Sequence, residues 1–402
     1  MSIIAAFTAP SFDQTTPAMI RFEFATASRV IFGRGCSAQL AALCQPLGSR
    51  ILLVTGSRPE RAEWAVESLR KAGMSCEIFS IQGEPKLGEA VAGAEIALKK
   101  GIQVVVGIGG GSAVDAGKAI AALAPQPKEA LHYLEVVGKG QALDHPSLPC
   151  IALPTTAGTG AEVTRNAVLS CPEHAVKASL RHASMLPQVA LIDPELARDC
   201  PAAVTAASGM DALTQCLEAY VSCRAQPMTD ALCAEGIRRA VRSLEKAVQD
   251  GSDLEAREDM ALAALFSGMA LANAGLGAVH GFAAPIGGKF HAPHGAVCAA
   301  LLAPVWKANA EIVQKSADSR LQERFQQAAG LLTGQPKADP QQAEALLRQM
   351  TKTLGIPSLR SFGLQEDHLC EMAEKASRAS SMKGNPVSLP QEQLIEILRE
   401  AL

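Results

Sequence analysis

The chain has 402 residues, which is enough for two domains that each bury a core. Its 37 Lys and Arg against 40 Asp and Glu, with only 4% aromatic residues, argue against binding to nucleic acid or to a membrane surface. The 11 cysteines are odd in number and include no C-x-x-C pair, and residues 1–17 lack the basic start of a signal peptide. We therefore expect free thiols in a reducing compartment, the cytoplasm.

The first half of the chain alternates short apolar runs with helical stretches. Strands are expected at residues 51–55, 76–80, 104–108, 149–153 and 189–192, with helices near 61–72 and 88–100. Alternation of this kind predicts a parallel sheet with crossover helices, so we assign residues 1–192 to an α/β domain.

The second half has a different character. Helical patterns cover residues 206–221, 228–248, 254–274 and 343–354, and a last helix starts at Gln391. No β-rich run appears, which predicts an all-helical domain over residues 193–402. Residues 260–288 carry no charged side chain and are long enough to cross a membrane, but Asn273, His280 and Pro285 interrupt them. We interpret this run as a core helix that breaks near Gly275.

A glycine-rich turn joins the 104–108 strand to the next helix. Gly109, Gly110 and Gly111 would let the backbone approach a phosphate group, and the helix start supplies N–H donors and a positive dipole end. Ser112 can cap the helix or donate its hydroxyl. A tight turn with no ligand explains the same residues equally well.

A second loop of small residues follows the 149–153 strand. It reads Leu-Pro-Thr-Thr-Ala-Gly-Thr-Gly-Ala-Glu and offers the hydroxyls of Thr155, Thr156 and Thr159. Two such loops at the carboxyl ends of parallel strands are typical of a dinucleotide crevice.

The helical half contains a candidate metal site. Asp211 and Gln215 are four residues apart, so they share one face of a helix, and two further candidates are His280 and His294. An aspartate with two histidines in an apolar domain suits Fe²⁺ or Zn²⁺. The alternative is a core histidine bonded to a carbonyl and an aspartate that meets a helix dipole.

Four segments in this order resemble the signature segments of the iron-containing (group III) alcohol dehydrogenases. They are GIGGGSAVDAGKAIA, LPTTAGTGAEVTRNAV, SGMDALTQCLEAYVS and GLGAVHGFAAPIGGKFHAPHG. The resemblance implies a dehydroquinate-synthase-like architecture, with a dinucleotide-binding domain, a helical domain and the site between them. It also implies a homo-oligomer, at least a dimer.

The resemblance assigns roles to particular positions. Gly109 to Ser112 would hold the pyrophosphate of NAD(P), and Asp211, His280 and His294 would ligate the metal. The rest of the cofactor would be lined by Gly56, Thr155, Thr156, Thr159, Asn166 and Lys177.

The sequence departs from the family pattern at three places. Gln215 stands where the family has a histidine ligand, so an amide oxygen, a water or nothing would take its place, and the metal would be held loosely. Ala284 replaces a further histidine, for which His291 is a possible substitute as a proton relay. Gly56 follows the first strand where NAD-preferring members tend to carry an aspartate, so NADP(H) should be accepted. Arg58 either pairs with the 2′-phosphate of NADP(H) or is a solvent-exposed side chain.

These observations predict metal-assisted hydride transfer between NAD(P) and a small alcohol or aldehyde. A metal-independent keto-acid reductase resembling maleylacetate reductase is a rival, favoured by the loss of histidine at Gln215. A non-catalytic nucleotide-binding protein is a second rival. Neither a nucleic acid nor a membrane is an expected partner.

Overall fold

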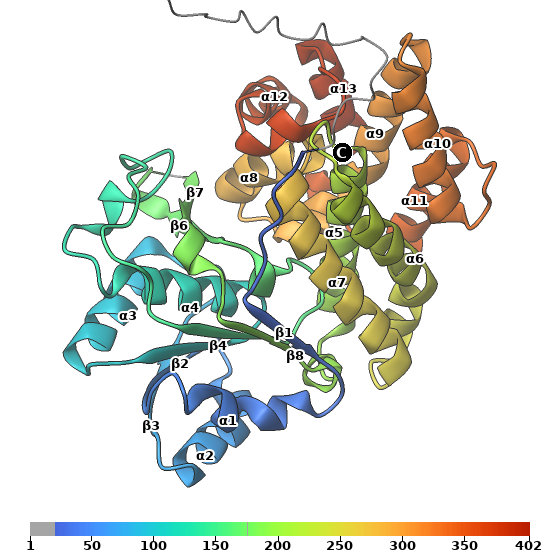
Figure 1. Cartoon of the computed structure of the whole chain (residues 1–402). Helices are drawn as coiled ribbons and strands as arrows, with labels where there is room; N and C mark the ends of the chain where they lie inside the picture. The colour runs from blue at the N-terminus through green and yellow to red at the C-terminus, as the bar shows by residue number, and fades with distance from the viewer. Residues whose placement is uncertain (1–20, 175) are drawn as a thin grey trace, which may run out of the picture.

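The computed structural model describes residues 21–174 and 176–402, so the prediction for residues 1–17 lies outside the described residues. Figure 1 shows two parts, a sheet flanked by helices and a larger helical assembly. The chain passes from the first part to the second after strand β8, Val189–Ile192.

The first part is built on a six-stranded parallel sheet with the order β1-β8-β5-β4-β2-β3. Its other strands are β1 Arg29–Phe32, β2 Arg50–Thr55, β3 Ser75–Ser80, β4 Val104–Gly109 and β5 Cys150–Pro154. The crossover helices are α1 Leu40–Cys44, α2 Glu63–Lys71, α3 Leu87–Lys99 and α4 Gly111–Leu123. The central strands are runs of Val, Ile and Leu because helices cover both of their faces, and this confirms the predicted fold class.

A small antiparallel hairpin, which the sequence did not predict, stands beside the sheet. It pairs β6, Asn166–Cys171, with β7, Val176–Arg181. Alternate residues such as Ala167, Leu169 and Leu180 are buried, and they pack in the core around α4. Both strands mix apolar and polar side chains, so they lack the continuous apolar run that marks the central strands of the parallel sheet.

The second part contains only helices among the residues that the structure describes after Ile192. They are α5 Ala202–Val221, α6 Pro227–Gln249, α7 Leu254–Ala274, α8 Ala278–Phe290, α9 His294–Lys315, α10 Ser319–Thr333, α11 Pro340–Thr353, α12 Leu369–Ser377 and α13 Gln391–Glu400. Asp253, Asp318 and Asp339 accept hydrogen bonds from free backbone N–H groups and so fix the starts of α7, α10 and α11.

The uncharged run 260–288 is not one helix. It breaks at Gly275, whose φ of 70° ends α7, and α8 leaves at an angle of 100°. Among the described residues, α9 is the one helix that is long and apolar enough to cross a membrane. The bent pair of α7 and α8 would be a second such span if the two helices are counted together. However, 78% of the apolar stretch of α9 is buried inside the protein, which is typical of a core helix.

The two parts meet backbone to backbone. Gly160, in the loop after β5, packs directly on Gly268 in the middle of α7, and a side chain at either position would overlap the other residue's backbone. This contact places the second threonine-rich loop against the helical part.

Candidate active site between the two parts

The glycine-rich turn lies at the carboxyl end of β4, next to the loop that follows β5. Gly109 pairs with Pro154 in the sheet, so the two loops leave the sheet side by side. Gly109 has φ 151°, and a Cβ at Gly111 would lie 2.5 Å from Oγ1 of Thr159. The loops therefore contact each other through positions that only glycine can occupy.

The helix α4 begins at Gly111, two residues earlier than a cap at Ser112 would imply. Gly110 is its N-cap residue and Ser112 lies inside the first turn, so Ser112 does not cap the helix. The first N–H groups of this turn have no partner within the helix. Gly110 has an ordinary extended conformation, and a Cβ there would lie 3.5 Å from Thr156.

A third strand end joins these loops. A Cβ at Gly109 would lie 3.6 Å from the backbone nitrogen of Gly56, the residue after β2. Gly56, Thr155, Thr156 and Thr159 are all partly exposed. The structure thus brings three of the sequence-predicted segments to one edge of the sheet.

The hairpin holds the two remaining cofactor candidates. The backbone carbonyl of Asn166 accepts a hydrogen bond from the buried Lys118 ammonium. Nζ of Lys177 lies 2.6 Å from a carboxylate oxygen of Glu84, and its side chain packs on Gly287 of α8, where a Cβ would lie 2.8 Å from Nζ. Lys177 therefore lies where the hairpin meets the helical part.

A compact cluster of possible metal ligands lies in the helical part. It consists of Asp211 on α5, His280 on α8, and His294 and Cys298 on α9, and one donor atom from each lies within 4.8 Å of all the others. Asp211 Oδ1 is 3.2 Å from Nε2 of His280 and 3.8 Å from Nε2 of His294. Cys298 Sγ is 3.7 Å from both histidine nitrogens.

Close helix packing produces this cluster. Gly295, in the first turn of α9, lies against the backbone of Ala207 on α5, where a side chain could not fit. Gly277 precedes α8, and a Cβ there would lie 3.0 Å from a carboxylate oxygen of Glu218. These glycines let α5, α8 and α9 approach until their polar side chains meet.

Glu218 holds His280 from behind. Its Oε2 lies 2.7 Å from Nδ1 of His280, and its Oε1 accepts the N–H of Val279 at 2.6 Å. A carboxylate that accepts from one ring nitrogen leaves the other free to bind a metal, an arrangement typical of histidine ligands. Glu218 lies seven residues after Asp211 on α5, a spacing that could have identified it in the sequence.

The close packing of these side chains shifts the pKa values of His280 and Asp211. Burial lowers the pKa of His280, but the nearby Cys298 sulfur and the carboxylates of Asp211 and Glu218 outweigh it and raise that pKa well above its ordinary value. Burial raises the pKa of Asp211, yet His294 and His280 hold it below its ordinary value. A divalent cation would relieve the same juxtaposition by displacing protons.

Gln215 is buried beside this cluster but is turned away from it. Its Nε2 lies 3.4 Å from Oδ2 of Asp211, the oxygen that does not face the histidines. Its Oε1 lies 3.0 Å from the Ser267 hydroxyl, whose single proton can also go to the carbonyl of Ala264 at 2.8 Å or to that of Gly158 at 3.3 Å. Ser267 thus lies between the threonine-rich loop and the helix that carries Asp211.

His291 lies at the end of α8 and is exposed. Its φ of 53° places it in the left-handed region. Among the described residues, no hydrogen bond or ion pair joins it to the cluster, although it precedes His294 by only three residues. His294 itself is 36% exposed, so the cluster opens to the surface on this side.

Comparison with known proteins identifies the family. The family model "Iron-containing alcohol dehydrogenase" matches residues 27–194, and "Fe-containing alcohol dehydrogenase family, C-terminal" matches residues 205–402. The chain belongs to the iron-containing alcohol dehydrogenase family. It is therefore an enzyme of an oxidoreductase family, as the four sequence segments predicted.

Several relatives of this alcohol dehydrogenase family member are similar over most of their length. Alcohol dehydrogenase 4 of Saccharomyces cerevisiae (strain YJM789) is 37% identical over 83% of the chain and 85% of its own length. The 1,3-propanediol dehydrogenase of Klebsiella pneumoniae is 35% identical over 94% of the chain and 98% of its own. A crystal structure of 1,3-propanediol oxidoreductase superimposes with a TM-score of 0.88 at 34% identity, covering 95% of this chain and all of that one.

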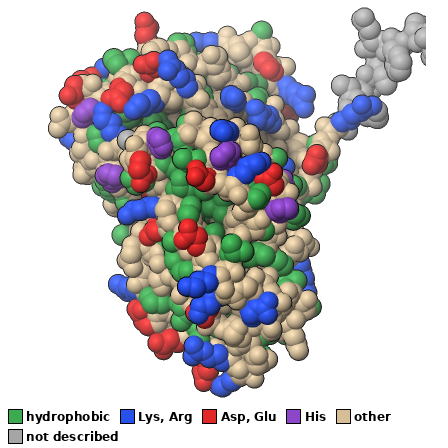
Figure 2. All heavy atoms as spheres, turned by 90° about the vertical axis from the view of Figure 1, so that its left-hand side faces the viewer, with side chains coloured by type: hydrophobic (Ala, Val, Ile, Leu, Met, Phe, Trp, Pro, Cys, Tyr) green, Lys and Arg blue, Asp and Glu red, His purple; other side chains and the backbone are tan. Residues whose placement is uncertain are grey.

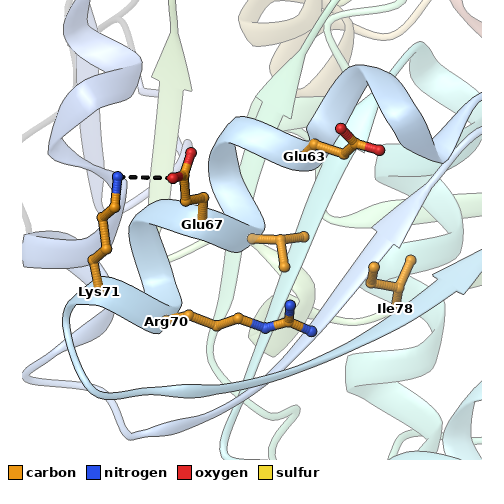
Figure 3. Close-up of a pocket in the computed structure, with 6 residues that line it drawn as sticks. Glu63, Glu67, Arg70, Lys71 and Ile78 are labelled. Carbon is orange, nitrogen blue, oxygen red and sulfur yellow. Dashed lines mark ion pairs between the residues drawn. The ribbon is translucent and has the colours of Figure 1, made fainter.

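A separate hollow lies at the β3 edge of the sheet. It has a volume of about 620 Å³ and lies between α2 and the edge strand β3, with Val66 and Ile78 in its wall and an ion pair of 2.8 Å between Lys71 and Glu67 at its rim (Figure 3). None of the sequence-predicted site residues lines it, so we do not assign the active site there.

Proposed function

We propose that the chain catalyses reversible hydride transfer between NAD(P) and a small alcohol or aldehyde. The observation that carries this proposal is the position of Ser267, whose hydroxyl lies between the carbonyl of Gly158 and the side chain of Gln215. A cofactor crevice and a cluster of metal-binding side chains are thereby only a few hydrogen bonds apart.

The proposed cofactor site uses the loops at the ends of β2, β4 and β5. Gly109, Gly110, Gly111 and Ser112 offer backbone N–H groups and the positive end of α4 to the pyrophosphate. Gly56, Thr155, Thr156, Thr159, Asn166 and Lys177 would line the remainder. When bound, the nicotinamide supplies or accepts the hydride. The close contact between Gly111 and Thr159 keeps the crevice in shape before the cofactor arrives.

A divalent metal, Fe²⁺ or Zn²⁺, fits the residues present. Asp211, His280 and His294 would hold it, since their donor atoms converge and Glu218 already fixes the ring of His280. The bound ion supplies Lewis-acid polarisation of the substrate oxygen. Gln215 would act by hydrogen bonding to Asp211 and so holding that carboxylate in place.

His291 is the proposed proton exchanger. It is exposed at the end of α8, close in sequence to His294, so it can pass a proton between solvent and the alcohol oxygen. Figure 2 shows hydrophobic side chains gathered across the middle of one face, with several histidines above them. The similar proteins include an alcohol dehydrogenase and a 1,3-propanediol dehydrogenase, which supports a small alcohol or aldehyde as the substrate.

We also propose that the chain divides at residues 192 and 193, functions in the cytoplasm and forms a homo-oligomer of at least two copies. The described cysteines are all free, which supports a reducing compartment. Sedimentation of the purified protein would test the oligomer.

The decisive experiment follows the absorbance of reduced nicotinamide with a panel of alcohols, aldehydes and keto acids, before and after removal of metal by a chelator. Alcohol or aldehyde turnover that is lost on chelation and returns with Fe²⁺ or Zn²⁺ supports the proposal. Turnover of keto acids alone, unaffected by chelation, would replace it with the maleylacetate-reductase-like rival. Cofactor binding without any turnover would identify a nucleotide-binding protein.

A further inference from the structure

The cluster contains one donor that neither the sequence analysis nor the proposed function uses. Cys298 is fully buried on α9, four residues after His294, so both side chains lie on the same face of that helix. Its Sγ lies 3.7 Å from Nε2 of His280 and 3.7 Å from Nε2 of His294. It is the fourth member of a group whose donor atoms all lie within 4.8 Å of one another.

Four of the six separations between these donor atoms match the edges of a tetrahedral site, and the other two lie within 4.8 Å. Zinc bonds of about 2.0–2.1 Å to nitrogen or oxygen and about 2.3 Å to sulfur imply donor separations of about 3.3–3.6 Å. The separations here are 3.2 Å and 3.8 Å from Asp211 to the two histidines and 3.7 Å from each histidine to Cys298. All of them lie within a few tenths of an ångström of that geometry.

Gln215 does not complete this tetrahedron. Its amide contacts Oδ2 of Asp211, whereas both histidines face Oδ1. Its oxygen, the atom that could bind a cation, faces the Ser267 hydroxyl at 3.0 Å. Gln215 therefore lies on the far side of the carboxylate from the cluster.

We propose that Cys298, and not Gln215, provides the fourth protein ligand of the metal site. This inference rests on the proposed function, because it assumes that Asp211, His280 and His294 bind the same ion. On binding, the Cys298 thiol loses its proton to solvent and the thiolate sulfur bonds to the cation. A set of one carboxylate, two imidazoles and one thiolate is softer than one without sulfur, so it favours Zn²⁺ over Fe²⁺.

Cobalt(II) tests the assignment without any enzyme assay, because a thiolate bound to Co²⁺ gives a charge-transfer absorption in the near ultraviolet. The full chain is stripped of metal and titrated with Co²⁺, and bound cobalt is measured beside the spectrum. Wild type should bind one cobalt per chain and show the absorption. Gln215→Met should keep it, and Cys298→Ala should lose it.

Cys216→Ala is the matched control, because Cys216 is equally buried and lies next to Gln215 but contacts the carbonyl of Ala263 instead of the cluster. It should keep the absorption. The affinity of Cys298→Ala for Zn²⁺ should fall more than about tenfold, since losing even an indirect partner of a ligand costs about 10–100-fold.

The outcomes separate the two levels of the proposal. Stoichiometric cobalt in wild type without a charge-transfer absorption overturns the role of Cys298 and leaves the proposed metal site intact. That reading needs no variant, so a folding defect in Cys298→Ala cannot obscure it. Negligible cobalt in both wild type and His280→Ala overturns the metal site itself, and the inference with it.

Discussion

The carboxylate of Glu218 lies 2.7 Å from Nδ1 of His280 and holds the ring with its other nitrogen directed at Asp211. Replacing Glu218 by Gln removes the charge but keeps the shape. We expect the affinity for Zn²⁺ to fall about 10–100-fold, measured by competition with a chelator. Glu371→Gln, which alters a surface carboxylate paired with Lys289 and Lys375, is the control and should change nothing. Equal affinities in all three proteins would remove Glu218 from the site.

Gly110 tests whether the glycine-rich turn binds phosphate. A side chain there meets only ordinary contact with Thr156, whereas Gly109 and Gly111 have no such room. Gly110→Val should therefore fold and lose NAD(P)H binding by at least about 100-fold, because the branched side chain blocks the approach of the pyrophosphate. The measurement is a fluorescence titration of reduced cofactor. Gly88→Val, at an open position in α3, is the control, and a folded Gly110→Val with unchanged affinity would make the turn purely structural.

The absence of an acidic residue after β2 predicts the cofactor preference. Gly56, Ser57 and Arg58 leave no carboxylate to repel the 2′-phosphate of NADPH, and Arg58 is exposed. NADPH should bind at least as well as NADH, and Arg58→Glu should weaken NADPH about tenfold, or about 1.4 kcal/mol, more than NADH. Arg61→Glu, a nearby exposed arginine, is the control. A wild-type preference for NADH above about tenfold contradicts the prediction.

Much of this architecture was accessible from the sequence. The buried strands of the parallel sheet and the break at Gly275 follow from apolar runs and from glycine, and both are confirmed. The β6–β7 hairpin was missed because its strands mix apolar and polar residues and form no continuous apolar run. Cys298 was missed although its spacing from His294 is the one that linked Asp211 to Gln215. The cluster forms where three helices meet, and their meeting point depends on close packing at positions such as Gly295. A local sequence pattern does not reveal such packing between distant helices.

His291 tests the proposed proton exchange. Its φ of 53° suits few side chains, but asparagine tolerates that conformation, so His291→Asn removes the imidazole without straining the backbone. We expect kcat to fall at least about tenfold, with loss of one ionisation from the pH profile and an unchanged Kd for the cofactor. His368→Asn, a partly exposed histidine in contact with Phe290, is the control. An unaltered pH profile would assign the proton to water.

Asp259 links α6 to α7 and predicts how stability depends on pH. Burial alone would raise the pKa of Asp259, but hydrogen bonds from Arg242 and Ser243 and the charge of Arg239 hold it below its ordinary value. Because the folded pKa is lowered, the stabilisation is present above the unfolded value of about 3.9 and disappears as pH falls through the folded value. Asp259→Asn should lose about 1.5–3 kcal/mol of unfolding free energy at neutral pH.

Urea unfolding at neutral and acidic pH measures this difference, which should shrink below about pH 4 as the wild-type carboxylate is protonated. Glu67→Gln, which breaks the exposed ion pair with Lys71, serves as the comparison and should leave stability unchanged at both pH values. A constant gap between wild type and Asp259→Asn across the acid range would show that the charge of Asp259 is not what holds the helices.

The glycine pair at positions 160 and 268 also limits how the halves of such enzymes can be exchanged. Each residue leaves room only for the backbone of the other, so both halves must have glycine at this contact. A chimera that joins the sheet of this chain to the helices of a relative would assemble only if the donor also lacks a side chain opposite Gly160. The compatibility of two halves is thus decided at a point that takes no part in the chemistry.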